Sequence, residues 1–157
     1  MKKVEILLVE DSPGDVRLIR EATKETAPGI QITVAKDGVE AMDHLVSCIG
    51  GKSRWPDLIL LDLNLPRKNG REVLAEVKGD PRLRQIPVVV MTSSQSDDDI
   101  ATAYGLNANC FVTKPHELGQ YIGIVQAIED FWFGTAQLPR HFTPAANPAS
   151  ATNRTRV

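Results

Sequence analysis

The stretch Leu58-Ile59-Leu60-Leu61-Asp62 decides the fold, because a run of apolar residues ends abruptly at a carboxylate. Such a run is typical of a strand buried on both faces of a parallel sheet. Two other runs behave alike: Val4–Val9 continues into Glu10-Asp11, and Phe111–Thr113 continues into Lys114. The carboxyl ends of parallel strands meet along one edge of a sheet, where ligands bind. We therefore expect these charged residues to converge there.

Strand and helix patterns alternate along the chain, which is typical of βαβ units. The pattern predicts an α/β fold with a central five-stranded parallel sheet and helices on both faces. The first helix has Ser12 as its N-cap and Pro13 in its first turn. The polar insertion Ser47–Pro56 is predicted to be an exposed loop. The expected strands are Val4–Val9, Ile30–Ala35 (in an outer position), Leu58–Leu61, Val88–Met91 and Cys110–Val112, and the later helices are expected at 38–46, 71–78, 97–106 and 116–133.

The bulk composition excludes several classes of protein. With 18 basic and 20 acidic residues among 157, the chain has no basic field that would favour nucleic-acid binding. No apolar run is long enough to span a membrane, and the N-terminus leaves no room for a cleavable signal. Cys48 and Cys110 have neither metal-type spacing nor the number for a disulfide framework. We expect a cytoplasmic protein with neither a nucleic-acid nor a membrane partner.

The chain divides into one domain and a tail. Residues 3–138 have the length and apolar content of a single domain with a full core. Residues 139–157 consist mainly of Pro, Ala, Thr, Asn and Arg, with little that is large and apolar. Such a segment cannot bury enough surface to offset its ordering entropy, so we predict that it is disordered.

The converging acids predict a metal site. Three carboxylates in one hollow repel one another unless cations lie among them. Mg²⁺ prefers oxygen ligands and is usually held by one or two carboxylates. Asp11 and Asp62 supply that pair, and the backbone carbonyl of Asn64 could complete the protein's share. Glu10 is better placed to accept hydrogen bonds from metal-bound water.

An aspartate at a strand end beside a divalent ion can also accept a phosphoryl group as a nucleophile. Lys114 would supply positive charge for that group, the Thr92 hydroxyl could donate to one of its oxygens, and the small Ser93 would leave room for entry. Taken singly, a strand-end Asp is usually a turn former, and Thr92-Ser93-Ser94 is usually a helix cap. These alternatives do not explain why neighbouring strand ends all bear suitable groups.

The order Glu10-Asp11, Asp62, Thr92, Phe111 and Lys114-Pro115 resembles the receiver domain of two-component response regulators, over about residues 3–133. The resemblance implies a flavodoxin-like (βα)5 fold, with Asp62 as the phosphoacceptor for a phosphohistidine of a partner kinase. It also implies that Asp11 and Asp62 bind Mg²⁺ with help from Glu10, and that Thr92 and Lys114 contact the phosphoryl group.

The same resemblance assigns further roles. Phe111 matches the switch aromatic that turns inward when Thr92 follows the phosphoryl group; the alternative is a plain core residue. The Lys114–Pro115 peptide is expected to be cis. Asn64 and Ser94 fall where receivers tune the lifetime of the phosphoryl-aspartate.

A narrower resemblance concerns three segments and the loop Ser47–Pro56. Leu60–Pro66, Gly70–Leu74 and Ile128–Trp132 look like parts of the single-domain regulators that pair with phytochrome-type histidine kinases in bacteria and cyanobacteria. The polar loop departs from the compact chemotaxis-type receiver. The resemblance implies a phytochrome-type kinase as the partner.

The last predicted helix carries a core-facing apolar stripe at helical spacing. Ile124, Phe131 and Phe133 lie outside the centre of that stripe. They either widen the buried face or form a partner surface, most simply of a symmetric homodimer. Receivers commonly dimerise through helix four, strand five and helix five, and residues 134–138 could extend as an arm across the partner. The stripe comprises Leu118, Tyr121, Ile122, Val125, Ile128 and Trp132.

These observations favour a phosphorylation-controlled signalling protein over an enzyme, acting through partner binding or as a relay intermediate. The alternative is a phosphohydrolase of the haloacid-dehalogenase type, which also forms an aspartyl phosphate. Such enzymes need a second Asp two residues after the nucleophile, and Asn64 occupies that position. A DNA-binding role for Arg140, Arg154 and Arg156 is disfavoured because these residues are sparse.

Overall fold

The structure is a computed structural model that describes residues 3–139, so the tail predicted to be disordered lies outside the described residues except for Pro139. The described part forms one parallel sheet with the strand order β2-β1-β3-β4-β5. The strands are β1 (Val4–Val9), β2 (Ile30–Ala35), β3 (Leu58–Leu61), β4 (Val88–Thr92) and β5 (Cys110–Thr113). The helices are α1 (Pro13–Thr26), α2 (Gly38–Ile49), α3 (Gly70–Gly79), α4 (Asp97–Gly105), α5 (Leu118–Ile128) and the π-helix η1 (Glu129–Thr135).

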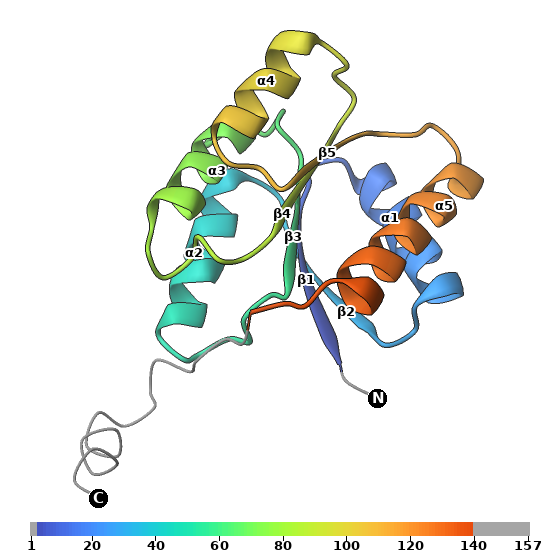
Figure 1. Ribbon diagram of the computed structural model, residues 1–157, viewed down its shortest axis with the longest axis horizontal. Coiled ribbons are helices and arrows are strands. Elements are labelled where there is room, and N and C mark those ends of the chain that lie inside the picture. The colour runs from blue at the N-terminus through green and yellow to red at the C-terminus, as the bar shows by residue number, and fades with distance from the viewer. Residues whose placement is uncertain (1–2, 140–157) are drawn as a thin grey trace, which may run out of the picture.

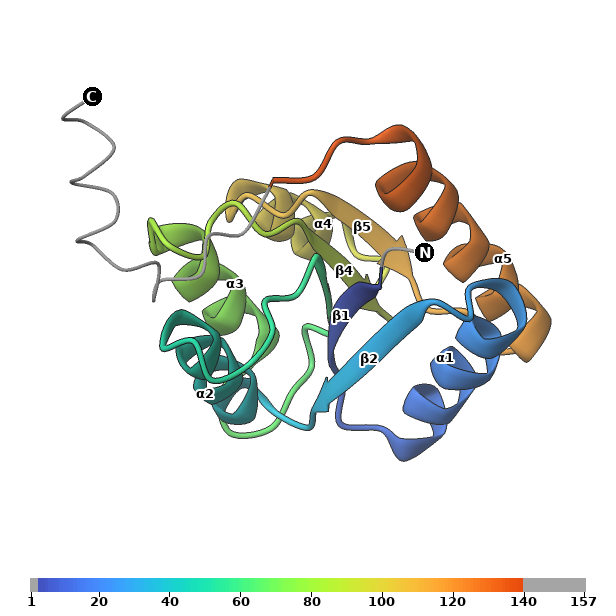
Figure 2. The same cartoon turned by 90° about the horizontal axis from the view of Figure 1, so that it is seen from below.

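The helices cover both faces of the sheet, as predicted. Helices α1 and α5 pack side by side on one face, while α2, α3 and α4 lie on the other (Figures 1 and 2). The predicted (βα)5 fold and the outer position of β2 are both confirmed. Among the described residues, no helix is both long enough and apolar enough to cross a bilayer.

The core consists of two layers because successive residues of a buried strand point to opposite faces. In β1, Leu7 and Val9 pack with α2, α3 and α4, whereas Ile6 and Leu8 pack with α1 and α5. Strand β3 is buried along its whole length, which explains its unbroken apolar sequence. Burying one Leu or Ile side chain of this kind contributes about 1.5–3 kcal/mol relative to leaving it exposed.

Polar N-cap side chains begin four of the helices. Ser12 accepts a hydrogen bond from the backbone amide of Asp15, which confirms the predicted start of α1. The caps of α2, α3 and α4 are Asp37, Asn69 and Ser96, and each accepts from the backbone amide three residues later. These caps place the polar helix starts near the carboxyl edge of the sheet.

Helix α3 begins in direct contact with the end of β3. A Cβ atom on Gly70 would lie 2.1 Å from the carbonyl oxygen of Asp62 and 2.6 Å from the Cα atom of Leu63. The Gly70 amide donates to the Leu63 carbonyl oxygen at 3.0 Å. Only glycine allows this approach, so the position of Asp62 depends on the packing of α3.

Two helices differ from the prediction by more than one residue at an end. Helix α2 continues to Ile49 instead of ending at Val46, because Cys48 adds another buried residue to its apolar face. The last helix begins at Leu118, is α-helical to Ile128, and then widens into η1, where the Ala136 amide donates to the Phe131 carbonyl oxygen at 2.7 Å. The wider turn changes the phase of the side chains, which a search for 3.6-residue periodicity does not detect.

The chain after η1 turns back under the sheet (Figure 1). Trp132, Phe133 and Leu138 line an open groove together with Glu5 and Trp55, near the amino ends of β1 and β3. The segment proposed as an intersubunit arm therefore lies against its own chain here.

Candidate functional site

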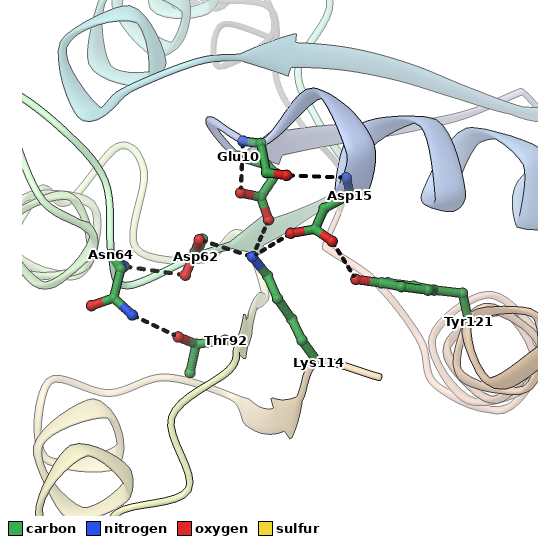
Figure 3. Close-up of polar contacts among 8 residues, drawn as sticks. Glu10, Asp15, Asp62, Asn64, Thr92, Lys114 and Tyr121 are labelled. Atoms are coloured by element: carbon green, nitrogen blue, oxygen red, sulfur yellow. Dashed lines mark hydrogen bonds and ion pairs between the residues drawn. The ribbon is translucent and has the colours of Figure 1, made fainter. Parts of the chain in front are cut away.

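The four charged residues expected to meet do so at the carboxyl edge of the sheet, where Figure 3 shows Glu10, Asp62 and Lys114. Glu10 and Asp11 follow β1, Asp62 follows β3, and Lys114 follows β5. Only 2% of Glu10 and 6% of Asp62 is exposed, and the Lys114 side chain is 11% exposed, whereas Asp11 is open to solvent. Charged groups this deeply buried require partners.

Lys114 contacts three carboxylates. Its Nζ atom lies 2.5 Å from Glu10 Oε1, 3.0 Å from Asp62 Oδ2 and 3.0 Å from Asp15 Oδ2. Burial alone would lower the pKa of Lys114, but its hydrogen bonds to Glu10 and Asp62 outweigh burial and raise the pKa above its ordinary value. The ammonium therefore stays charged, and each of its three donors has an acceptor.

The site contains more negative groups than Lys114 can balance. The pKa of Glu10 is raised from 4.5 to about 7, because burial and the nearby charge of Asp62, which raise it, together outweigh the hydrogen bond to Lys114, which lowers it. Glu10 Oε2 also accepts from the Ser12 amide at 3.2 Å. Three carboxylates contact one ammonium and the Asp11 carboxylate lies near two of them, so a further cation would relieve their repulsion.

The acids have a suitable arrangement for a metal ion. Glu10, Asp11 and Asp62 each offer an oxygen atom, and these atoms lie within 4.8 Å of one another. Such an all-oxygen set suits Mg²⁺ or Mn²⁺, and the exposed Asp11 leaves a side open where the ion could keep water ligands. The backbone amide of Asn64 donates to Asp62 Oδ1 at 3.1 Å. Coordination by the Asn64 carbonyl oxygen stays a prediction.

The three residues at the end of β4, Thr92, Ser93 and Ser94, have different surroundings. Thr92 is fully buried, and its hydroxyl oxygen lies 3.5 Å from the Asn64 side-chain nitrogen, at the outer limit of a hydrogen bond. Ser93 is exposed. Ser94 donates to Asp99 Oδ2 at 2.5 Å, and Asp99 in turn accepts from Arg71 of α3 at 2.6 Å. Ser94 is thus tied to α4 and α3.

The predicted cis peptide is wrong. The described residues contain no cis peptide bond, so Lys114–Pro115 is trans. The trans form of an X–Pro bond is favoured by only about 0.5–1 kcal/mol, so the tertiary surroundings decide the isomer and the dipeptide alone does not. Phe111, the predicted switch residue, is partly buried against the core layer of α2, α3 and α4.

The three residues assigned to a partner surface have different surroundings. Ile124 and Phe133 are partly buried against the core layer of α1 and α5, which agrees with the alternative that they widen the buried face. Phe131 is 52% exposed, and its ring contacts Trp132 edge to face with the centroids 5.1 Å apart. Phe131 is therefore the apolar side chain of this set that is available to a partner.

Two residues of the site were missed in the sequence. Asp15 was given no role in the sequence analysis, and Tyr121 was assigned only to the core stripe. Tyr121 is fully buried and donates its hydroxyl to Asp15 Oδ1 at 3.2 Å, while the other oxygen of Asp15 contacts Lys114 (Figure 3). The position of Asp15 near the site was detectable in principle, because a capped helix begins immediately beside Asp11, whereas no local signal indicates its contact with Tyr121.

Comparison with known proteins agrees with this geometry. Residues 6–126 match the family model of the response regulator receiver domain. The chain is 47% identical over 137 residues to the response regulator Rcp1 of Synechocystis sp., covering 85% of this chain and 92% of that protein. The residues matched to the family model include the whole acidic edge from Glu10 to Lys114, whereas Phe131 and Phe133 lie outside them.

Two solved structures share both fold and sequence. The phosphorylated cyanobacterial phytochrome response regulator RcpA is 46% identical with a TM-score of 0.79, covering 88% of this chain and 100% of that chain. The Mn²⁺-bound form of Rcp1 is 46% identical with a TM-score of 0.79, covering 87% of this chain and 99% of that chain. From its fold, its acidic edge and these similarities, the chain belongs to the family of response regulator receiver domains.

Proposed function

We propose that the Asp62 carboxylate accepts a phosphoryl group from a phosphohistidine of a partner histidine kinase. One observation carries the proposal: the carboxylate is 94% shielded yet charged neighbours surround it, with the Lys114 ammonium 3.0 Å from Oδ2. An Asp62 oxygen attacks phosphorus, the P–N bond to the imidazole breaks, and the imidazole leaves with its bonding electrons. The product is an aspartyl phosphate.

The neighbouring side chains stabilise the transferred group. Lys114 would follow the new negative charge, and the buried Thr92 hydroxyl would donate to a phosphoryl oxygen. Asp11, Asp62 and the Asn64 carbonyl would hold Mg²⁺, with Glu10 accepting from its water ligands. When bound, the ion neutralises charge on the phosphoryl oxygens.

The response of the fold would begin at Thr92. Movement of its side chain toward the phosphoryl group leaves space that Phe111, only partly buried at the next strand, could enter. Ser93 leaves an open approach to Asp62 for the kinase, and Asn64 and Ser94 would influence access of water to the aspartyl phosphate. The protein would therefore act as a switch and not as an enzyme with repeated turnover.

The kinase is proposed to be of the phytochrome type. The support is the 46% identity to a protein described as a cyanobacterial phytochrome response regulator. Incubation with the purified, phosphorylated histidine kinases of the host should label this protein fastest with a phytochrome-type kinase. Faster labelling by several unrelated kinases would remove this assignment and leave the phosphoacceptor role intact.

A homodimer is proposed through α4, β5 and α5, together with the segment 134–138. Its support is the exposed apolar surface of Phe131 (52%) after α5 and of Tyr104 (49%) on α4. Sedimentation velocity should show a dimer that Phe131→Ser weakens. Val46→Ser, at a 61% exposed residue of α2, is the matched control and should leave the dimer unchanged. A monomeric wild-type protein would contradict this part of the proposal.

The alternative, a phosphohydrolase of the haloacid-dehalogenase type, is disfavoured by residue 64. An acid/base is needed there, and an asparagine amide has no ionisable group that could serve as one near neutral pH. A hydrolase would release phosphate from many monoesters with repeated turnover. We expect no such turnover by this protein.

The test of the phosphoacceptor is labelling by radioactive acetyl phosphate with Mg²⁺. The wild-type protein should acquire an acid-labile and base-labile label, as expected for an acyl phosphate, and Asp62→Asn should lose it because the amide is a poor nucleophile. Asp43→Asn, an exposed residue on α2, makes the same chemical change away from the site and should be labelled normally. Labelling of Asp62→Asn at the wild-type rate would refute the assignment.

A further inference from the structure

The carboxylate of Asp15 lies across the Lys114 nitrogen from Asp62 and outside the group of acids suited to a metal (Figure 3). Those acids are Glu10, Asp11 and Asp62, whose oxygen atoms group within 4.8 Å, and Asp15 is not among them. Asp15 instead places Oδ2 3.0 Å from Lys114 Nζ. Its contact is with the lysine, and it would remain outside the first ligand sphere of an ion.

Asp15 is itself held on two sides. Its backbone amide donates to the N-cap oxygen of Ser12 at 3.3 Å, which fixes its place in the first turn of α1. Its Oδ1 atom accepts from the Tyr121 hydroxyl at 3.2 Å. Tyr121 belongs to α5 and has no exposed surface, so the hydroxyl that holds Asp15 is anchored in the core between α1 and α5.

These contacts fix the direction of the ammonium. An ammonium has three donors in tetrahedral geometry, and here they have acceptors in Glu10, Asp62 and Asp15. Two acceptors leave a long lysine side chain free to rotate about the line between them, and a third removes that freedom. Figure 3 shows Asp15 and Tyr121 approaching Lys114 from the side away from Thr92.

We propose that Asp15, held by the Tyr121 hydroxyl, is a positioning residue that directs the Lys114 ammonium toward the oxygen of Asp62 that reacts. This inference rests on the proposed phosphoacceptor function and extends it. Asp15 touches neither the phosphoryl donor nor the reacting atoms, so it acts through Lys114. Tyr121 acts in turn through Asp15.

A simpler role for Asp15 is the favourable interaction of any acid with a helix N-terminus. That role predicts a small loss of stability on substitution and no effect on Lys114. It does not account for the buried tyrosine on another helix that binds the same carboxylate. The two roles therefore predict different effects of an Asp15 substitution on the Lys114 ammonium.

The test compares Asp15→Ala, Tyr121→Phe and Asp15→Asn with the wild type in full-length protein. The first measurement is the labelling rate by acetyl phosphate at saturating donor and saturating Mg²⁺. Loss of one charge-assisted hydrogen bond should slow Asp15→Ala by about fivefold, and Tyr121→Phe by about twofold. Asp15→Asn should recover most of the rate, because its amide oxygen can accept from Lys114 while its amide nitrogen donates to Tyr121.

The second measurement needs no phosphoryl donor. Hydrogen exchange of the Lys114 ammonium, followed by NMR, should accelerate in Asp15→Ala and less in Tyr121→Phe. The control is Glu21→Ala, an exposed acid of α1 that pairs with Lys24 at 3.8 Å. It removes the same charge from the same helix and should change neither the labelling rate nor the exchange.

The outcomes are separable. A wild-type labelling rate in Asp15→Ala, or slower labelling with unchanged Lys114 exchange, would overturn the positioning role. Tyr121→Phe decides the question if Asp15→Ala fails to fold, since a normal rate and normal exchange there would also overturn it. Absence of labelling in the wild type would instead refute the proposed function, and the exchange measurement would still decide whether Asp15 holds Lys114.

Discussion

Strand β3 carries an aspartate beside each end, and the two carboxylates have different surroundings. Asp57, before the strand, accepts the backbone amide of Glu5 at 2.9 Å, and its own amide donates to the Glu5 carbonyl oxygen at 2.7 Å. Asp62, after the strand, faces the buried ammonium of Lys114. One carboxylate completes the pairing of backbone groups, and the other lies in a cluster of charges.

The difference comes from the direction of the parallel strands. At the carboxyl edge, each of the strands β1, β3 and β5 is followed by charged residues that lie close together, and helices begin around them. At the amino edge, the neighbouring ion pair of Glu5 and Arg54 is 3.3 Å long, and Arg54 is 70% exposed. An exposed pair of this kind contributes little to stability. Residue type alone therefore does not distinguish the two aspartates.

The largest expected effect on stability lies at the carboxyl edge. Gly70→Ala would place a methyl group 2.1 Å from the carbonyl oxygen of Asp62, so α3 must move away from β3. We expect a loss of about 3 kcal/mol or more in the free energy of unfolding, measured by urea denaturation. Gly79→Ala, in the same helix with no atom within 4 Å of the added Cβ, should change stability by less than about 1 kcal/mol. Equal effects at both positions would show that α3 does not rest on Asp62.

A smaller effect concerns the charge of Glu10. Its pKa is raised to about 7 in the folded protein, so the folded state binds the proton more tightly than the unfolded state does between about pH 4.5 and 7. Stability from this group is therefore greatest at the acid side and falls as the pH rises through that range, by on the order of 2 kcal/mol.

Glu10→Gln isolates this contribution from other groups, such as His44, whose pKa burial lowers. The difference in unfolding free energy between variant and wild type should change across the range, moving in favour of the variant as the pH rises. Mg²⁺ should stabilise the wild type most at the alkaline end, because ligand binding to the folded state adds stability. A difference that is constant with pH would contradict the raised pKa.

The smallest effect is expected at the amino edge. Asp57→Asn keeps an oxygen that can accept the Glu5 amide, so it should cost at most about 1 kcal/mol in the free energy of unfolding. Labelling by acetyl phosphate should be unchanged. Impaired labelling in this variant would mean that the two edges are coupled, and the contrast between the two aspartates would no longer hold.

Most of the features that separate the two edges of the sheet could be predicted from the sequence. Unbroken apolar runs predicted the buried strands, and the strand-end charges predicted where the site would form. The first helix was also predictable, because Ser12 and Pro13 are local signals. In each case the information lay within a few consecutive residues.

The missed features depend on contacts between distant segments. Asp15 and Tyr121 are far apart in the chain and meet only because α1 packs on α5. The trans Lys114–Pro115 peptide and the widening at η1 are likewise settled by tertiary packing, since the local energy differences are small. Local patterns carry no information about such pairings.

The most direct test is to identify the residue that carries the phosphoryl group. Borohydride reduces an aspartyl phosphate to homoserine, which tandem mass spectrometry places in the sequence. After incubation with acetyl phosphate and Mg²⁺, we expect homoserine at position 62. Homoserine at position 11 or 57 instead, or none at all in a protein that has acquired label, would contradict it.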